Sequence, residues 1–170
     1  MSSYPSVPEP QSVFRVEKGR TEATLTLSNG TTVRGCFFIA GSSATHAGPE
    51  RIKDVLNAEP GFFPFEMAGP NGSQTSLYNR DHVVVAALHD TDEAQSVPGY
   101  DVATWRQVSM LLSNGVRLHG TVSVYRPQGR DRLSDFARTP DRLKYLEDAA
   151  VTFLVNVTHV VELLEEIPQS

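Results

Sequence analysis

The sequence predicts a mainly β protein built from two similar modules in tandem. Residues 27–35 read Leu-Ser-Asn-Gly-Thr-Thr-Val-Arg-Gly, and residues 112–120 return as Leu-Ser-Asn-Gly-Val-Arg-Leu-His-Gly. Two further motifs recur in the same order, at 51–55 with 132–136 and at 79–84 with 156–161. The offset between copies falls from 85 to 81 to 77, as loop deletions would produce. We therefore interpret the chain as an internal duplication.

Each module begins with a predicted hairpin. Residues 23–27 and 32–40 flank Asn29-Gly30, a pair that favours a type I′ turn, and the same turn at 113–115 joins 107–112 to 117–125. Gly35 and Gly120 fall at the same point inside the second strand, where a residue without a side chain permits a sharp bend. A curved sheet of short strands indicates a small barrel.

The later elements follow from prolines and short apolar runs. Residues 49–58 and 133–138 have the pattern of helical turns that end before a proline, and 62–65 and 143–146 read as third strands. The last two strands, 75–78 with 82–88 and 151–155 with 159–164, are separated by very few residues. We therefore expect tight turns between the strands of each pair.

Composition divides the chain into four parts. Residues 1–12, rich in proline and serine, are predicted to be a disordered tail, with a possible edge strand at 13–16. The first module spans 13–90, an acidic linker with Pro98-Gly99 spans 91–103, and the second module spans 104–167. Modules this small bury limited cores, so contact between the copies is expected to supply the rest.

Charge and cysteine content narrow the function classes. The net charge of −5 is unfavourable for a dedicated nucleic-acid binder, although a sum can hide a local patch. No apolar stretch reaches the roughly 20 residues that span a bilayer, and we expect a cytoplasmic protein. The single cysteine, Cys36, lies in an apolar run and is interpreted as a buried small hydrophobe.

The repeated pattern resembles the Sm-like superfamily, which includes Hfq. The resemblance rests on five short strands per module, the Asn-Gly turn, the glycine of the second strand, and an Asn-x-x-His-Val-Val turn at 79–84 and 156–161. It implies strongly bent five-stranded barrels that form rings by pairing edge strands. The chain is also similar to uncharacterised bacterial proteins with an Arg-Leu-x-Asp-Phe insertion, seen at 132–136 and more loosely at 51–55.

The same turns differ from those of RNA-binding Sm proteins. Those proteins carry an Arg-Gly pair before the final strand, whereas this chain has Asn79-Arg80 and Asn156-Val157. The Tyr-Lys-His turn of Hfq is also absent. The resemblance therefore implies the fold more directly than it implies RNA binding.

Two pairs of turn residues are candidate sites. His82 and His159 recur at one position but have no partner at metal-ligand spacing, which favours a role in the turn or at an interface over a metal or acid-base role. Asn79 and Asn156 are interpreted as turn residues that bond nearby backbone groups. Contact with a nucleotide base is the alternative for both asparagines.

The insertions carry the other candidate residues. The basic run contains Arg126, Arg130, Arg132, Arg138, Arg142 and Lys144. Aromatic neighbours make it a mixture that can bind phosphate and stack bases, although three aspartates favour a salt-bridged loop instead. Two Arg–Asp pairs have the spacing of local ion pairs on a helical turn: Arg51 with Asp54, and Arg132 with Asp135. Alternatively, the insertions that contain these pairs form a surface that binds a partner.

No nucleophile elbow, P-loop, dinucleotide-binding motif or zinc signature is present, and we expect no enzymatic activity, cofactor or metal. The leading hypothesis is a tandem Sm-like assembly protein, in which three chains close a pseudo-hexameric ring and bind a partner through the insertions. The alternative is RNA or single-stranded nucleic-acid binding through the basic run and the Asn-x-x-His turns. A sensor with a small molecule between the modules is a third possibility.

Overall fold

The structure is a computed structural model that describes residues 18–89, 92–125, 129 and 132–167. It is mainly β, as predicted, with ten strands in one antiparallel sheet of order β10-β6-β7-β8-β9-β5-β1-β2-β3-β4. The predicted tail 1–12 and the possible strand 13–16 lie outside the described residues. Within the described residues, no helix is long and apolar enough to cross a membrane.

We call residues 18–89 the first half and residues 104–167 the second half. The first half contains β1 (Lys18–Leu27), β2 (Thr32–Ala40), α1 (Ile52–Asn57), β3 (Phe62–Gly69), β4 (Gly72–Asn79), the 3-10 turn η1 (Arg80–His82) and β5 (Val83–Leu88). The second half contains β6 (Thr104–Leu112), β7 (Arg117–Val124), α3 (Leu133–Ala137), β8 (Leu143–Glu147), β9 (Thr152–Asn156), η3 (Val157–His159) and β10 (Val160–Glu165). The predicted linker forms two short turns, α2 (Asp92–Gln95) and η2 (Tyr100–Val102).

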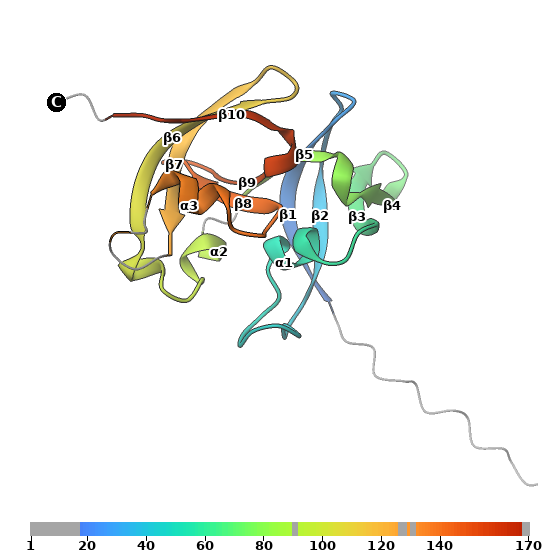
Figure 1. Cartoon of the computed structure of the whole chain (residues 1–170). Helices are drawn as coiled ribbons and strands as arrows, with labels where there is room; N and C mark the ends of the chain where they lie inside the picture. The colour runs from blue at the N-terminus through green and yellow to red at the C-terminus, as the bar shows by residue number, and fades with distance from the viewer. Residues whose placement is uncertain (1–17, 90–91, 126–128, 130–131, 168–170) are drawn as a thin grey trace, which may run out of the picture.

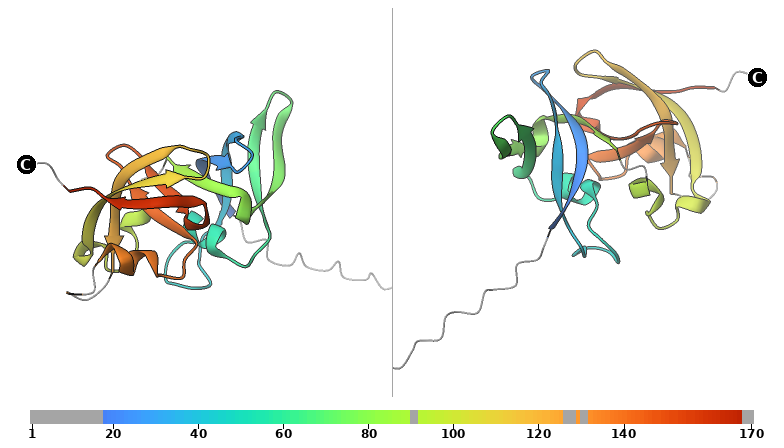
Figure 2. Two further views of the ribbon diagram at one scale, coloured as in Figure 1. Left: turned by 45° about the horizontal axis from the view of Figure 1, so that its top comes forward. Right: turned by 180° about the vertical axis from the view of Figure 1, so that it is seen from behind.

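The two halves pair their strands in the same order and lie side by side (Figures 1 and 2). The first half runs β5-β1-β2-β3-β4 and the second runs β10-β6-β7-β8-β9, and β5 pairs with β9 to join them. The sheet is open, with β4 at one end and β10 at the other. The finer prediction of two Sm-like barrels therefore stays a prediction.

The last two strands of each half exist where predicted and are joined by tight turns, but they do not pair with each other. β4 and β5 are joined by η1, and β5 pairs with β1 and β9 instead of β4. In the second half, η3 separates β9 from β10, and β10 pairs with β6. The cause is the asparagine at the end of each strand: Asn79 Oδ1 accepts from Asp81 N at 3.0 Å, and Asn156 Oδ1 accepts from Thr158 N at 3.1 Å. This side-chain turn redirects the backbone away from a hairpin.

The Asn-Gly turns form as predicted, but they are not of type I′. A type I′ turn needs positive φ at both central residues, whereas Gly30 and Gly115 have φ of 86° and 84° and no described residue other than glycine has positive φ. Gly30 N bonds to Leu27 O at 2.9 Å, and Leu27 N bonds to Thr31 O at 2.9 Å. This is the three-residue loop in which a left-handed glycine follows a tight turn.

Two apolar clusters form the core, and each one includes residues from both halves. The first is centred on Phe37, Phe63 and Phe65 of the first half and also contains Leu143 and Leu154 of the second. The second is built on residues such as Met110, Val122 and Leu146 of the second half and also contains Val84 and Val85 of the first. The halves therefore share their cores across the β5–β9 pairing.

The predicted glycines allow two strands to approach closely. A Cβ at Gly35 would lie 2.1 Å from the carbonyl oxygen of Glu66, and one at Gly120 would lie 2.6 Å from that of Glu147. In both cases the second strand of the half bends against the third. Because backbone cannot move aside as a flexible side chain can, alanine does not fit at either position.

We predict that Gly35→Ala lowers the free energy of unfolding by about 1–3 kcal/mol, because the added methyl overpacks the β2–β3 contact. Gly41→Ala is the matched control, since a Cβ there meets nothing within 4 Å. It should stay within about 0.5 kcal/mol of the parent. Urea unfolding followed by circular dichroism measures both variants, and equal stability of the two would contradict the close approach.

Candidate functional site

The pairing of β5 with β9 is the main contact between the halves. The register places Val85 opposite Val155, Ala86 opposite Leu154, and Leu88 opposite Thr152. These residues are all buried. Backbone hydrogen bonding and apolar burial therefore act together along the same strands, and we call this contact the internal junction.

Polar contacts at the end of β9 fix the register of the internal junction. Asn156, which is buried, donates from Nδ2 to Val83 O at 2.9 Å. His159 donates from Nε2 to Asp81 O at 2.8 Å, so its Nδ1 accepts from the Ser113 hydroxyl at 2.9 Å. A slip of one residue would leave these buried or half-buried groups without partners, which is unfavourable.

Three further contacts join α1 and η1 to the start of β8. The Arg142 guanidinium pairs with the Asp81 carboxylate. Asn57 bonds both backbone groups of Leu143, accepting from its N–H at 2.9 Å and donating to its carbonyl at 3.0 Å. Lys53 Nζ lies 3.1 Å from Asp141 Oδ2. The junction is thus held by side chains on both sides of the sheet ladder.

The linker adds a buried carboxyl group between the halves. Glu93 of α2 accepts from the backbone N–H of Ile52, at the start of α1, through Oε1. Its other oxygen and the hydroxyl of Tyr145 in β8 are both buried. Burial raises the pKa of Glu93 to about 7 against the opposing effect of backbone hydrogen bonds from Ile52 and Lys53. Glu93 is therefore mostly protonated below neutral pH.

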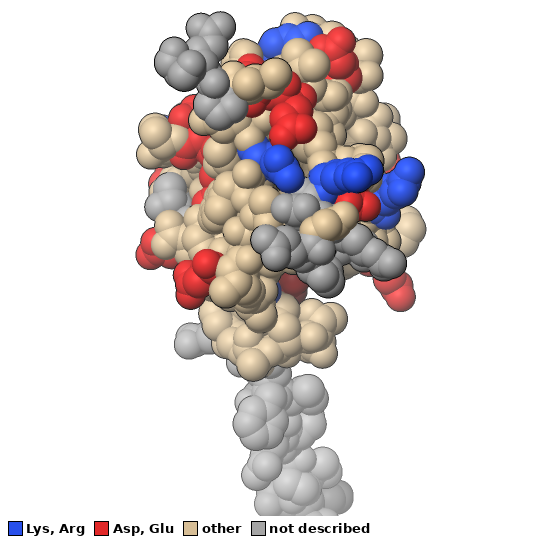
Figure 3. All heavy atoms as spheres, turned by 60° about the vertical axis from the view of Figure 1, so that its left-hand side comes forward, with Lys and Arg blue, Asp and Glu red and all other residues tan. Residues whose placement is uncertain are grey.

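The described residues of the predicted basic run take separate places in the structure. Arg126 and Arg130 lie outside the described residues. Arg132 and Arg138 are exposed near α3, whereas Arg142 pairs with Asp81 and Lys144 is buried with 3% of its surface exposed. Figure 3 shows one side of the molecule, where several Lys and Arg side chains lie in a band and most of the Asp and Glu side chains lie above or below it. Neighbours in the sequence thus take separate places in the fold.

The predicted turn residues all make contacts inside the chain. Asn79 and Asn156 start the 3-10 turns as predicted. His82 lies 2.7 Å from Ser28 Oγ through Nδ1, which matches the contact of His159 with Ser113. His159 also crosses the internal junction, as described above. The interface role expected for a histidine at this position is therefore present in the second half.

The expected Arg51–Asp54 ion pair is replaced by a different contact. Asp54 accepts from the backbone N–H of Arg51 at 2.8 Å and lies 2.6 Å from His46 Nε2. The Arg51 guanidinium donates to Ser96 at the end of the linker turn. In the second half, the backbone N–H of Arg132 likewise donates to Asp135 at 3.1 Å. In both halves the aspartate carboxylate therefore caps the start of the short helix and does not pair with the arginine side chain.

The two ends of the sheet expose apolar side chains that sequence reasoning missed. No described strand pairs with the outer edge of β4 or of β10. Leu77 on β4 is 65% exposed and Val161 on β10 is 67% exposed, and Phe62 and Leu164 near these edges are also exposed. The only sequence signal for Leu77 is an apolar residue within an otherwise polar strand. We call β4 and β10 the open edges.

Within the described residues, no group of three or more His, Cys, Asp or Glu side chains is placed to hold a metal ion. Comparison of the chain with protein-family models, with curated proteins and with solved structures finds no match in any of the three. The candidate site therefore rests on the geometry of the internal junction and of the open edges.

The pKa of Glu93 predicts how stability depends on pH. Since the folded chain holds this proton up to about pH 7 and the unfolded chain releases it near 4.5, this carboxyl should contribute stability that falls as pH rises between those values. Glu93→Gln keeps an acceptor for Ile52 and cannot ionise. We predict that the melting temperature of Glu93→Gln exceeds that of the parent by more at pH 8 than at pH 5.

The exposed Glu59 provides the control, because Glu59→Gln removes a carboxylate that faces solvent. Thermal unfolding at both pH values measures all three proteins. A difference between Glu93→Gln and the parent that does not change with pH would contradict burial of an ionisable Glu93 between the halves.

Proposed function

We propose that this protein is a non-enzymatic assembly protein made of two Sm-like modules, and that its chains associate head to tail through the open edges. The observation that carries the proposal is that the chain already contains one such contact. At the internal junction, the fifth strand of one half pairs with the fourth strand of the other. Within the described residues, the outer edges of a fourth strand, β4, and of a fifth strand, β10, have no strand partner. Unpaired edges must be paired or covered to prevent aggregation.

Corresponding residues support the proposal. The offset of 77 that relates Asn79 to Asn156 also relates Leu77 to Leu154 and Val84 to Val161. Leu154 and Val84 are completely buried at the internal junction, whereas Leu77 and Val161 are about two-thirds exposed. The open edges thus carry apolar side chains at positions that the internal junction buries. Burial of these side chains by a second chain would remove apolar surface from water, which is favourable.

The internal junction also predicts the register of the contact between chains. Ala86 lies opposite Leu154, so Leu163 of one chain would lie opposite Leu77 of the next. Asn79 would take the role of Asn156 and donate to the carbonyl of Val160. The charged pair of Arg142 with Asp81 has no counterpart, because the corresponding residues are Gly61 and Thr158. The contact between chains should therefore be weaker than the contact within the chain.

Repetition of one heterologous contact gives either a closed ring or an open filament. With two modules in each chain, three chains supply the six modules of a pseudo-hexameric ring, and this is the assembly we propose. The short helices α1 and α3, which carry the two insertions, would then recur around the ring. They provide a repeated surface for a protein partner.

We predict that Leu77→Lys or Val161→Lys alone converts the assembly to a monomer at micromolar concentration, because each contact uses one open edge of each kind. Light scattering should give three times the 18.7 kDa chain mass for the parent and the chain mass for each variant. Val102→Lys is the control, since Val102 is exposed in η2 and lies on neither open edge. A monomeric parent would sink the proposal.

Mixing the two variants tests the direction of the contact. Leu77→Lys keeps an intact β10 and Val161→Lys keeps an intact β4, so an equimolar mixture should form a dimer with one chain of each kind. If like edges paired instead, β4 with β4 or β10 with β10, a variant would already form a dimer alone through its intact edge. Mixing the two variants would then not increase the mass. A mixture that stays monomeric while the parent assembles would exclude head-to-tail pairing.

Nucleic-acid binding is the competing function, and most of its predicted contacts are used within the chain. Arg142 pairs with Asp81, Lys144 is buried, and His159 donates across the internal junction. We expect a pool of labelled single-stranded RNA to show no retention by the parent at low salt. Retention that weakens steeply as salt increases would favour the competing function, because phosphate contacts release counterions. The ratio of absorbance at 260 and 280 nm of the purified protein is an independent check.

A further inference from the structure

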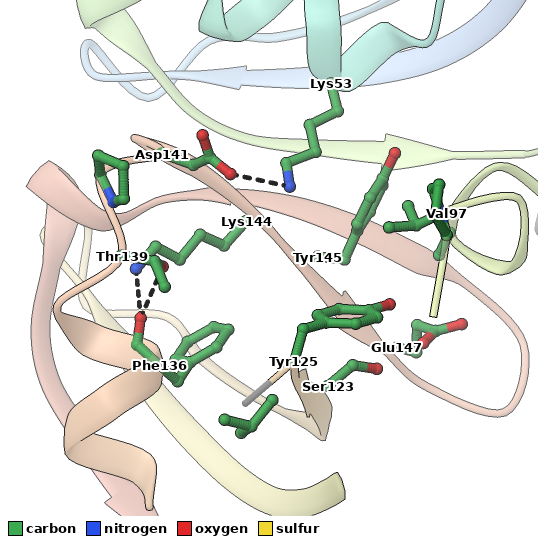
Figure 4. Close-up of a pocket in the computed structure, with 14 residues that line it drawn as sticks. Lys53, Val97, Ser123, Tyr125, Phe136, Thr139, Asp141, Lys144, Tyr145 and Glu147 are labelled. Carbon is green, nitrogen blue, oxygen red and sulfur yellow. Dashed lines mark hydrogen bonds and ion pairs between the residues drawn. The ribbon is translucent and has the colours of Figure 1, made fainter. Parts of the chain in front are cut away.

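A cavity of about 400 Å³ lies between the linker and the second half (Figure 4). Its walls come from three parts of the chain: Lys53 of α1, Val97 and Pro98 of the linker, and Tyr125, Phe136 and Tyr145 among the residues of the second half. This volume lies within the range of roughly 300–1,000 Å³ that is typical of small-molecule sites. The cavity is therefore large enough for an organic ligand.

The most unusual residue of the cavity is Lys144. Its equivalent in the first half is Phe63. Phe62 lies opposite Asn79 and Leu143 lies opposite the equivalent Asn156, and Phe63 and Lys144 are the next residues. Phe63 is completely buried in the aromatic cluster of the first half. The second half thus has a lysine, 3% exposed, where the first half has a core phenylalanine. Burying an ammonium group in place of an apolar ring is unfavourable unless the charge has a partner.

Lys144 forms a hydrogen bond to backbone but no ion pair among the described residues. Its Nζ donates to the carbonyl of Phe136 at 2.6 Å and lies 4.8 Å from the centre of the Phe136 ring. Burial lowers the pKa of Lys144, and the nearby Asp141 carboxylate opposes this effect without forming an ion pair with it. A buried cation in a cavity wall without an ion pair favours an anionic ligand.

The other charged groups of the cavity are already engaged. Lys53 pairs with Asp141, so these two charges offset each other. Glu147 accepts from the Tyr100 hydroxyl at 3.1 Å, and burial raises its pKa. The remaining walls are mostly aromatic or apolar, with the hydroxyl groups of Ser123 and Thr139 among them. Of the two lysines in the wall, Lys144 is therefore the one whose ammonium group has no ion pair among the described residues.

We propose that this cavity binds a small organic anion with an aromatic body, with its acidic group at Lys144 and its ring among Tyr125, Phe136 and Val97. The site does not depend on assembly, because all of its walls belong to one chain. It adds a ligand-binding function to the proposed assembly. Its ligand would contact both halves and the linker that joins them.

The test uses 8-anilinonaphthalene-1-sulfonate, an aromatic anion that fluoresces when it enters an apolar site. The full-length parent should bind it saturably, with one site per chain. In Lys144→Met, which keeps the length of the side chain and removes the charge, affinity should fall at least tenfold, as loss of a charge-assisted contact predicts. Val97→Trp should also abolish binding, because it fills the cavity without altering Lys144.

Two controls make the experiment decisive. Lys18→Met removes an exposed lysine of β1, and Leu77→Lys alters an open edge, and both should bind the dye as the parent does. The melting temperature of Lys144→Met should equal or exceed that of the parent, because Thr139 Oγ still donates to Phe136 O at 2.9 Å. The proposal is overturned if the parent shows no saturable binding, if Lys144→Met binds normally, or if Lys144→Met melts well below the parent.

Discussion

The antiparallel pairing of β5 with β9 is the contact on which the rest of the fold depends. It joins two five-stranded groups into one sheet, and it also allows each half to complete the core of the other. Leu154 packs into the first cluster, and Val84 packs into the second. Modules of about 65 residues bury limited apolar surface when they fold alone. The halves therefore have a physical reason to stay together, beyond their being joined by a linker.

Differences between the halves would make the proposed contact between chains weaker than the contact within a chain. The internal junction has the Arg142–Asp81 pair and the two hydrogen bonds of Asn57 with Leu143 in addition to the strand ladder. The corresponding open edges keep the apolar residues and the asparagine but lack this charged pair. Loss of the charged pair should lower the affinity of the proposed contact between open edges. It should leave the register of the strands unchanged, because the alternation of apolar side chains still sets that register.

The sequence predicted the features that follow from local rules. The Asn-Gly turns, the bend at Gly35 and the asparagine turns depend on residues close in the chain, and all of them appear in the structure. The partners of β5 and β10 could not be predicted in the same way, because strand pairing is decided by contacts between distant residues. The places of the basic residues could not be predicted for a related reason. Lys144 and Arg142 are neighbours in sequence, but one enters the interior while the other crosses to the first half.

The linker helix α2 carries Glu93 and also forms part of the cavity wall. Tyr145 both lines the cavity and lies beside Glu93, while Ala94 of the same short helix forms part of the cavity wall. Protonation of Glu93 removes a charge that is unfavourable between the halves, next to the part of the linker that lines the cavity. If protonation of Glu93 strengthens binding of the proposed ligand, the ligand must raise the affinity of Glu93 for its proton by the same factor, because coupling between two sites is reciprocal. The proposed ligand and the protonation of Glu93 would then both act on one element, the linker helix α2.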